Sequence, residues 1–402
     1  MDHKIKAYEQ RKHSRSMAAL DLARRALLGL ASLAASSRAI TVTPAGPPVT
    51  VWASVDSLHK CGVNDTPDIP TRAFQAGDGV VHMITGSTSF HWMTGPTVFN
   101  QTRNCSAAWN STENPDPSVF ASAEWLDSPH VFDNGTVVAL VHTEFDAMNI
   151  QTPKCNLSYP FCWTVTIGLA VSQDFGFTWQ HARPPPHHLV ASVPYEFNRT
   201  QIASGWGDPS NIVTNPADGL FYFAAWNRHQ VGLQQPGICL MRTADLTDPA
   251  SWRGYGGDGE YNVSFVSPYG MPPGDAGAHV CTVAKNLPNC PVGGIAWSTY
   301  LLQFVAVICC NGGGVSFSFS PDLVDWTVAE ELYSFKDLPP AVQKNVTSFT
   351  YPSLLDPAAA AAVGDKNYNT IGQDAPLFWA SIGHSPYTDG RRVWSTPMHY
   401  ER

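Results

Sequence analysis

One pattern recurs along the chain and constrains its fold more than any other feature. A polar turn leads into a short apolar run, a tight turn follows, and a second apolar run returns. The clearest copy starts at Gly207-Asp208-Pro209, turns at Asp218-Gly219 and continues through the aromatic run 220–226. Turn chemistry and alternation of this kind are typical of a β-hairpin. Four further copies start near residues 68, 128, 293 and 351, and in the last of them a longer link replaces the tight turn.

Three of the five units end alike, with a Ser or Thr, an Asp and a Trp around a turn. They are the segments 172–179, 243–252 and 320–326. In such a turn the Asp side chain accepts hydrogen bonds from the following backbone, and the Trp packs between neighbouring sheets. We therefore expect Asp174, Asp245 and Asp322 to stabilise turns and to take no part in chemistry.

The repeated unit predicts the architecture. Each unit has two inner strands from its hairpin and a later pair of strands that meets at a turn; in the first unit this turn is Met93–Phe99. Five such units predict an all-β fold, a five-bladed β-propeller of four-stranded antiparallel blades. The run Val49–Trp52 is expected to pair with the last blade and to close the ring. Residues 40–402 then form a single domain.

The first 39 residues differ from the rest of the chain. The basic pair Arg24-Arg25 precedes the apolar run 26–35, and small residues follow to Ala39. This order predicts a signal peptide or, because sixteen residues precede Met17, a signal anchor. An amphipathic helix or a transit peptide is the alternative interpretation. The apolar run is short for a membrane span, and no other stretch is long and apolar enough to cross a bilayer.

Potential glycosylation sites support a secreted protein. Nine Asn-x-Ser/Thr sequons, none with Pro in the middle, start at Asn64, Asn100, Asn104, Asn110, Asn134, Asn156, Asn198, Asn262 and Asn345. Such sequons are acceptors for N-linked glycans in the secretory pathway. Together with the signal-like segment they favour a secreted glycoprotein.

The nine cysteines all follow the signal-like segment. In an oxidising compartment most of them are expected to pair. Cys155 with Cys162, and Cys281 with Cys290, are candidate short-loop disulfides, and the odd count leaves one thiol over. We expect no metal site and no cofactor, because no Cys-x-x-Cys and no compact His pair with ligand spacing occurs. His187-His188, which follow three prolines, are interpreted as a solvated loop.

Charge excludes one class of partner. Residues 1–39 contain eight of the 24 Lys and Arg and three of the 33 Asp and Glu, which leaves the remainder with a net charge of −14. A nucleic-acid partner is not expected from such a balance. An acidic, aromatic-rich surface suits neutral or cationic ligands, with carbohydrate among them.

Two turns resemble those of known propeller families. Segment 172–179 resembles the Asp-box of sialidases, Ser-x-Asp-x-Gly-x-Thr-Trp, and Ser320 with 322–326 resembles the Ser-x-Asp-Leu-x-x-Trp turn of arabinanase, xylosidase and invertase type glycosidases. Asp208-Pro209 is similar to the strand starts of the same five-bladed enzymes. The resemblance covers about residues 60–390 as architecture and only short motifs as sequence. It implies a glycoside hydrolase, although Asp-boxes also occur in propellers without activity.

Strand direction selects candidate site residues. The start of an innermost strand and the end of the second strand lie on the same face of the ring, because the two strands are antiparallel. The candidates on this face are Asp68, Glu144 and Asp208 for catalysis, and Arg72, His142, Asn227, Arg228 and Tyr351 for substrate binding. Segments 146–163 and 184–206 are expected to form the walls of the pocket. Aromatic side chains there can stack on sugar rings; the candidates are Trp92, Trp163, Trp206 and Trp226.

Glycosidic hydrolysis needs two carboxyl groups, one protonated as acid and one ionised as base or nucleophile. By position, the resemblance implies that Asp68 is the base, Asp208 modulates and Glu144 is the acid. Glu144 departs from the family pattern, because it ends a second strand. In the alternative interpretation all three acids are structural, and the protein is a non-catalytic carbohydrate-binding or adhesion propeller.

A sialidase-like enzyme is a further alternative. Sialidases carry Arg-Ile-Pro near the first inner strand, and here the same place reads Asp68-Ile69-Pro70. The exchange of Arg for Asp argues against sialic acid, although Arg72 is near. In a sialidase-like enzyme Tyr351 would be the nucleophile. Cleavage of a neutral or weakly charged glycan by Asp68 and Glu144 remains the leading hypothesis, and a lyase or transferase on the same scaffold would look alike in sequence.

Overall fold

The computed structural model describes residues 39–53, 61, 66–148, 155, 157, 160–272, 274–310, 312–344, 346–382 and 391–402. The five sheets lie in one compact unit that comprises Val42–Glu401, apart from the first residue of β1. Of the other unit, Met1–Thr41 with Arg402, the structure describes only residues 39–41 and 402. The predicted signal segment therefore lies outside the described residues up to residue 38, as do the sequon asparagines at 64, 156 and 345.

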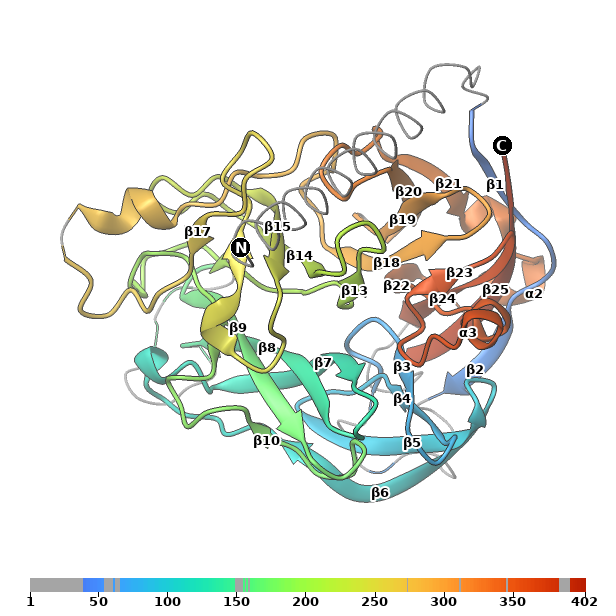
Figure 1. Ribbon diagram of the computed structural model, residues 1–402, viewed down its shortest axis with the longest axis horizontal. Coiled ribbons are helices and arrows are strands. Elements are labelled where there is room, and N and C mark those ends of the chain that lie inside the picture. The colour runs from blue at the N-terminus through green and yellow to red at the C-terminus, as the bar shows by residue number, and fades with distance from the viewer. Residues whose placement is uncertain are drawn as a thin grey trace, which may run out of the picture. The chain divides into compact units, whose positions relative to one another are not determined.

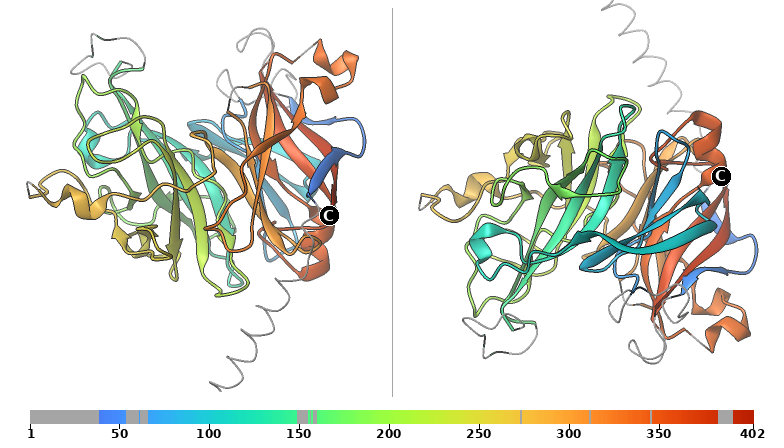
Figure 2. Two further views of the ribbon diagram at one scale, coloured as in Figure 1. Left: turned by 90° about the horizontal axis from the view of Figure 1, so that it is seen from above. Right: turned by 90° about the horizontal axis from the view of Figure 1, so that it is seen from below.

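The described strands form a five-bladed β-propeller, which confirms the predicted fold class. Five sheets follow one another in chain order around a common centre (Figure 1). The main strands of each blade pair antiparallel with their neighbours, and the short strands β12 (Ser204–Gly205) and β23 (Thr370–Ile371) each join a blade in parallel. The two short α-helices, orange and red in Figure 2, lie at the side formed by the last blades.

Blade 1 consists of β3 (Arg72–Gln75), β4 (Val81–Ile84), β5 (Ser89–Thr97) and β6 (Asn100–Asn110). Blade 2 consists of β7 (Ala123–Val131), β8 (Val137–Asp146), β9 (Trp163–Ser172) and β10 (Gln180–His181), with β11 (Leu189–Ala191) and β12 (Ser204–Gly205) on β9. Blade 3 consists of β13 (Val213–Thr214), β14 (Phe221–Asn227), β15 (Gly237–Thr243), β16 (Arg253–Gly254) and β17 (Val263–Ser264).

Blade 4 consists of β18 (Val292–Ser298), β19 (Gln303–Ile308), β20 (Gly314–Ser320) and β21 (Glu330–Ser334), with β23 (Thr370–Ile371) parallel to β18. Blade 5 consists of β22 (Ser348–Leu354), β24 (Asp374–Ile382) and β25 (Arg391–Glu401), with β1 (Thr41–Pro44) and β2 (Val49–Ala53) on β25. The helices are α2 (Pro340–Gln343) and α3 (Pro357–Val363), and the 3-10 turns are η1 (Pro117–Val119), η2 (Pro249–Ser251), η3 (Asp275–His279) and η4 (Phe335–Asp337).

The ring closes as predicted. Strand β2 pairs with β25, so a strand from the start of the described chain completes the blade that ends it. The Trp52 side chain of β2 is 4% exposed and packs in a cluster with Val393 of β25. Closure of this kind protects sheet edges that would otherwise expose unpaired backbone groups.

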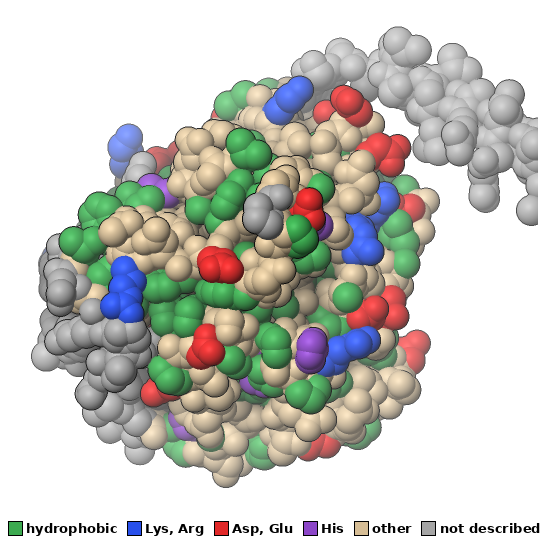
Figure 3. Space-filling model, turned by 90° about the vertical axis from the view of Figure 1, so that its left-hand side faces the viewer, with side chains coloured by type: hydrophobic (Ala, Val, Ile, Leu, Met, Phe, Trp, Pro, Cys, Tyr) green, Lys and Arg blue, Asp and Glu red, His purple; other side chains and the backbone are tan. Residues whose placement is uncertain are grey.

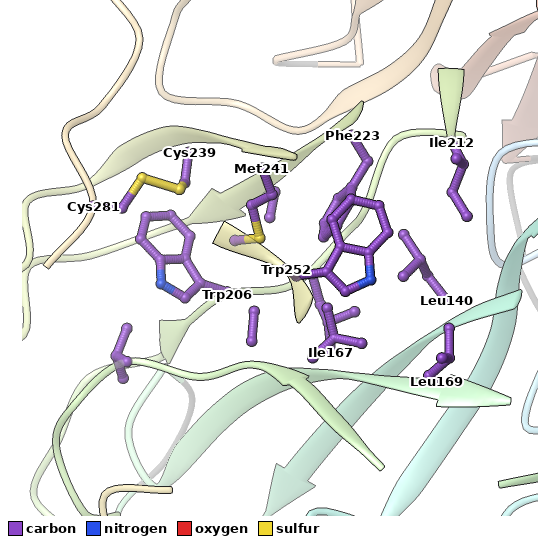
Figure 4. Close-up of a cluster of buried hydrophobic side chains, with 14 of the residues drawn as sticks. Leu140, Ile167, Leu169, Trp206, Ile212, Phe223, Cys239, Met241, Trp252 and Cys281 are labelled. Carbon is purple, nitrogen blue, oxygen red and sulfur yellow. A yellow bond between two sulfur atoms is a disulfide. The ribbon is translucent and has the colours of Figure 1, made fainter. Parts of the chain in front are cut away.

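Apolar side chains fill the spaces between blades. Alternation along β8 places Leu140 on the side of blade 3, where it joins Phe223 of β14 and Trp252 in one buried cluster (Figure 4). The rings of Phe223 and Trp252 meet edge to face with centroids 4.7 Å apart. Trp206, which the sequence left open as a sugar-stacking residue, is fully buried in the same cluster.

The outer turns are closed by the acids that the repeat singled out. Asp174 accepts hydrogen bonds from Ser172 Oγ at 2.7 Å and from Thr178 Oγ1 at 2.7 Å, and Trp179 donates to Gly176 O at 2.9 Å. Burial alone would raise the pKa of Asp174, but the hydrogen bonds from Thr178 and Ser172 lower it below its usual value. Asp245 and Asp322 accept bonds from the turns that follow them.

Four disulfide bonds join Cys61 to Cys105, Cys155 to Cys162, Cys239 to Cys281, and Cys290 to Cys310. The predicted Cys155–Cys162 bond is confirmed, and the predicted Cys281–Cys290 bond is wrong. Cys290 faces Cys310 because the pairing of Val292 with Ile308 brings the flanks of β18 and β19 together. Cys309 is the unpaired cysteine. Four disulfides are typical of a protein that folds in an oxidising compartment.

Two surface properties bear on partners. Among the residues described, no helix is long and apolar enough to cross a membrane. On the face shown in Figure 3, Lys and Arg side chains are scattered among acidic, polar and apolar ones.

Candidate active site

The three candidate acids come from three blades and lie close enough for the charges of two of them to affect the third. Asp68 precedes β3, Glu144 lies near the end of β8, and Asp208 lies in the turn before β13. The charges of Asp208 and Asp68 both raise the pKa of Glu144, and both also raise the pKa of Tyr351. The structure therefore brings together residues that strand direction placed on one face of the ring.

Asp68 is held by three side chains. The hydroxyl of Tyr351 donates to its Oδ1 at 2.9 Å, the indole of Trp125 donates to its Oδ2 at 3.2 Å, and Arg391 forms an ion pair with Oδ1. Its side chain remains 26% exposed. These contacts fix the orientation of the carboxylate and leave it accessible to solvent.

Arg391 is a site residue that sequence reasoning missed. It lies at the start of β25 and also donates to Pro67 O at 3.1 Å. Burial lowers its pKa, but the charges of Asp68 and Tyr351 and the hydrogen bonds to both side chains together raise it above the usual value. No motif surrounds Arg391, and 323 residues separate it from Asp68, so only the closed ring brings the two together.

Tyr351 is a hydrogen-bond donor to Asp68. Burial, followed by the charge of Asp68, raises its pKa well above the usual value. Its φ of 51° is an unusual conformation for a residue other than glycine, which marks it as a position that its surroundings constrain. A phenol held protonated in this way is poorly suited to the nucleophile role that a sialidase-like mechanism requires.

A chain of hydrogen bonds links the other two acids through His142. Strand alternation puts His142 and Glu144 on the same side of β8. His142 Nε2 lies 3.0 Å from Glu144 Oε1, and the backbone N–H of Asp208 donates to His142 Nδ1 at 3.0 Å. Asp208 adopts a φ of 45°, an unusual backbone conformation for a residue other than glycine. His142 thus sets the distance between the turn at Asp208 and the end of β8.

The pKa of His142 and its hydrogen bonds point to different protonation states of the ring. Burial lowers its pKa, whereas the bond to Glu144 and the charges of nearby carboxylates raise it, to about 9 in sum. A protonated ring, however, would point an Nδ1–H at the N–H of Asp208. We assign the neutral ring with its proton on Nε2, because only that form accepts at Nδ1 and donates to Glu144.

Glu144 is the acid whose pKa the site raises. Burial is the largest cause, the charges of Asp208 and Asp68 add to it, and the bond to His142 opposes it. A carboxyl group with a raised pKa beside a second carboxylate in a different environment is the arrangement that acid and base catalysis uses.

Glu144 and Asp208 line a pocket with aromatic walls. The other lining side chains include Trp163, Trp226 and Arg228. The Arg228 guanidinium lies 4.7 Å from the ring centre of Trp226 and 6.0 Å from that of Trp163. A second hollow on the opposite side of β8, lined by Thr143 and aromatic side chains, contains none of the predicted site residues.

Two residues that were predicted to bind substrate, Arg72 and Asn227, instead form hydrogen bonds within the protein. Arg72 is buried and donates to Asp127 at 3.1 Å, Pro209 O at 3.0 Å and Gly293 O at 2.5 Å. Asn227 is fully buried, where its amide accepts from Gly205 N and donates to Gln235 O, both at 3.0 Å. Both side chains are buried and form hydrogen bonds with other protein groups, so we do not assign them a role in substrate binding.

Comparisons with known proteins give structural similarity only. No protein-family model matches the chain, and no curated protein matches it in sequence. Similar solved structures include an exo-β-1,3-galactanase from Phanerochaete chrysosporium, at 10% identity and a TM-score of 0.49 over 87% of this chain. This chain covers 64% of the galactanase.

Two further solved structures are similar. A family 117 glycoside hydrolase from Zobellia galactanivorans has 10% identity and a TM-score of 0.49 over 90% of each chain. An α-L-arabinanase from Cellvibrio cellulosa has 10% identity and a TM-score of 0.45, over 82% of this chain and 90% of the arabinanase. Similarity at this level carries no argument about activity, and the assignment of this chain to the five-bladed propellers rests on its own strand pairing.

Proposed function

We propose that the protein is a secreted glycoside hydrolase that cleaves a neutral or weakly charged glycan. The observation that carries the proposal is the contrast between two neighbouring carboxyl groups. The Glu144 side chain is 23% exposed and has a raised pKa, and Asp68 is oriented by Arg391, Trp125 and Tyr351. A carboxyl group with a raised pKa near a second carboxyl group that is oriented by side-chain contacts supports general acid and base catalysis.

In this mechanism Glu144 donates its proton to the glycosidic oxygen as the bond to the anomeric carbon breaks. His142 donates to Oε1, so Oε2 is the oxygen that carries the acid proton. Asp68 takes a proton from the water that attacks the anomeric carbon. Burial and the charge of Asp208 favour the protonated form of Glu144, and Trp163 and Trp226 offer ring faces for the sugar.

The test begins with hydrolysis of a panel of neutral glycans by the purified protein. We expect Asp68→Asn and Glu144→Gln each to lower kcat by about 10²- to 10⁴-fold, the usual contribution of one acid or base. Asp374→Asn is the matched control, because this carboxylate is 73% exposed and pairs with His399. Unchanged rates in both site variants would refute the assignment of the site.

A binding propeller is the second candidate, and one observation favours it. Every oxygen of Asp68 already has a protein partner, as a structural carboxylate would. This function predicts glycan affinity that survives Asp68→Asn and Glu144→Gln, with no product after long incubation.

Secretion is supported by the signal-like segment, the nine sequons and the four disulfides. The turn of Asp174 and Thr178 supports kinship with propellers that carry an Asp-box. Expression of the full chain in a eukaryotic host tests secretion. We expect protein in the medium whose mass falls after enzymatic removal of N-glycans, and an unglycosylated protein retained inside the cells would contradict it.

A further inference from the structure

Outside the candidate active site, blade 2 gathers three side chains that are common metal ligands. Glu124 lies in β7, His181 in β10, and His188 directly before β11. Each offers one ligand atom, and the three atoms all lie within 4.8 Å of one another. Glu124 and His188 are fully buried, and the His181 side chain is 15% exposed. The prediction that His188 belongs to a solvated loop is therefore wrong.

His188 has the hydrogen bond of a metal-bound imidazole. Its Nε2 lies 3.1 Å from the carbonyl oxygen of Phe120, and a carbonyl only accepts, so Nε2 carries the ring proton. Nδ1 is then a bare acceptor, buried, and no described residue bonds to it. Burial of such a lone pair costs free energy unless a donor or a metal ion meets it. Metal-ligating histidines usually donate their other N–H to a backbone carbonyl or a carboxylate.

The other two side chains are equally well oriented. Glu124 Oε1 lies 2.6 Å from His181 Nε2, while Oε2 accepts from the backbone N–H of Thr112 at 2.9 Å. The His181 and His188 rings are tilted against each other with centroids 4.3 Å apart. A Cβ at Gly168 would lie 2.7 Å from His188 Cδ2, so glycine at this position leaves room for the ring.

We propose that Glu124 Oε1, His181 Nε2 and His188 Nδ1 bind a divalent transition-metal ion, with Zn²⁺ the best fit. Two imidazoles and one carboxylate suit Zn²⁺, whereas Mg²⁺ and Ca²⁺ prefer oxygen ligands. The ion replaces the proton shared by Glu124 and His181. Water completes a tetrahedral shell from the partly exposed side of His181.

The position of the site indicates a stabilising role. Glu124 and Trp125 are consecutive in β7, so their side chains point to opposite faces of the sheet. Trp125 contacts Asp68, and Glu124 therefore lies on the other face. The ion ties β7 to β10 and to the segment before β11, and it lies away from the groups proposed for hydrolysis. The inference is therefore independent of the proposed function.

Calorimetric titration of the full-length secreted protein with ZnCl₂ tests the proposal. The protein is prepared without a histidine tag and is stripped with EDTA before dialysis. We expect one Zn²⁺ per chain, and no competition from Mg²⁺ or Ca²⁺ at equal concentration. Glu124→Gln and His181→Gln should each bind Zn²⁺ at least about 10- to 100-fold more weakly. His187→Gln is the matched control and should bind as the unaltered protein does.

Thermal unfolding separates loss of the metal from loss of the fold. In EDTA the unaltered protein, His181→Gln and His187→Gln should have the same Tm, and Zn²⁺ should raise the Tm of all but His181→Gln. Three outcomes would overturn the proposal: no binding by the unaltered protein, unchanged binding by both Glu124→Gln and His181→Gln, or binding that disappears in Cys309→Ser instead.

Discussion

At the residue scale, the acid of the candidate site depends on its neighbours for its pKa. The negative charge of Asp208 is one cause of the raised pKa of Glu144. Asp208 contacts His142 through its backbone N–H, and Asp208→Asn retains this hydrogen bond. Asp208→Asn therefore changes charge while keeping the hydrogen-bond chain.

We expect Asp208→Asn to lower the pKa of Glu144. Because activity requires protonated Glu144, it is lost as pH rises through that pKa, so the alkaline limb of the pH profile should move to lower pH. The measurement is kcat/KM against pH on a glycan that the protein cleaves. Asp374→Asn should leave the profile in place, and an alkaline limb that does not move in Asp208→Asn would remove Glu144 as the acid.

Glu144→Gln should stabilise the fold while it lowers activity. A carboxyl group whose pKa is raised in the folded state binds more protons there than in the unfolded chain, so it lowers stability as pH rises above its unfolded value. Gln removes this cost and still accepts from His142. We expect a higher Tm for Glu144→Gln at neutral pH, and a difference that disappears below about pH 4, under the unfolded pKa of Glu. A lower Tm at neutral pH would contradict the raised pKa.

At the element scale, stability comes from the apolar layers between blades. Phe223 is fully buried between blades 2 and 3, in contact with Trp252. Phe223→Ala should lower the free energy of unfolding by about 3–5 kcal/mol, because it removes apolar burial and leaves a cavity. Urea unfolding gives the value. Leu233→Ala, at a side chain that is 63% exposed, should change it by less than about 0.5 kcal/mol.

Elements also show where local reasoning succeeds. Turn residues and alternation predicted the tight hairpins that open blades 1 to 4, because strand formation in a hairpin depends on neighbours along the chain. The same reasoning predicted Cys155–Cys162, whose partners are separated by seven positions. It failed for Cys281, whose partner Cys239 lies 42 positions away in β15 and is reached only when the loop after β17 folds back.

At the scale of the whole molecule, Arg72 joins four blades. From blade 1 its guanidinium bonds Asp127 of blade 2, Pro209 at the entry to blade 3 and Gly293 of blade 4. Burial lowers the pKa of Arg72 and raises that of Asp127, and their attraction opposes both shifts. The fold is therefore expected to lose less stability when both side chains are replaced than when only one of them is.

Arg72→Met should lower the free energy of unfolding by about 3–5 kcal/mol, because it leaves the Asp127 carboxylate buried without its cation. The double variant Arg72→Met, Asp127→Leu should recover part of that loss. Urea unfolding of both variants measures the difference. A double variant less stable than Arg72→Met alone would show that Asp127 does not depend on Arg72.

The sequence by itself determined the periodic and local features: five repeated strand pairs, the closing strand at Val49–Trp52, the turns closed by Asp side chains and the residue types that lie on one face of the ring. These depend on turn chemistry and on alternation over a few positions. Only the tertiary structure decided which side chains meet. Arg391 reaches Asp68, His188 is buried beside Glu124 and Arg72 spans the centre of the ring because closure brings distant segments within bonding distance, and no local pattern encodes those contacts.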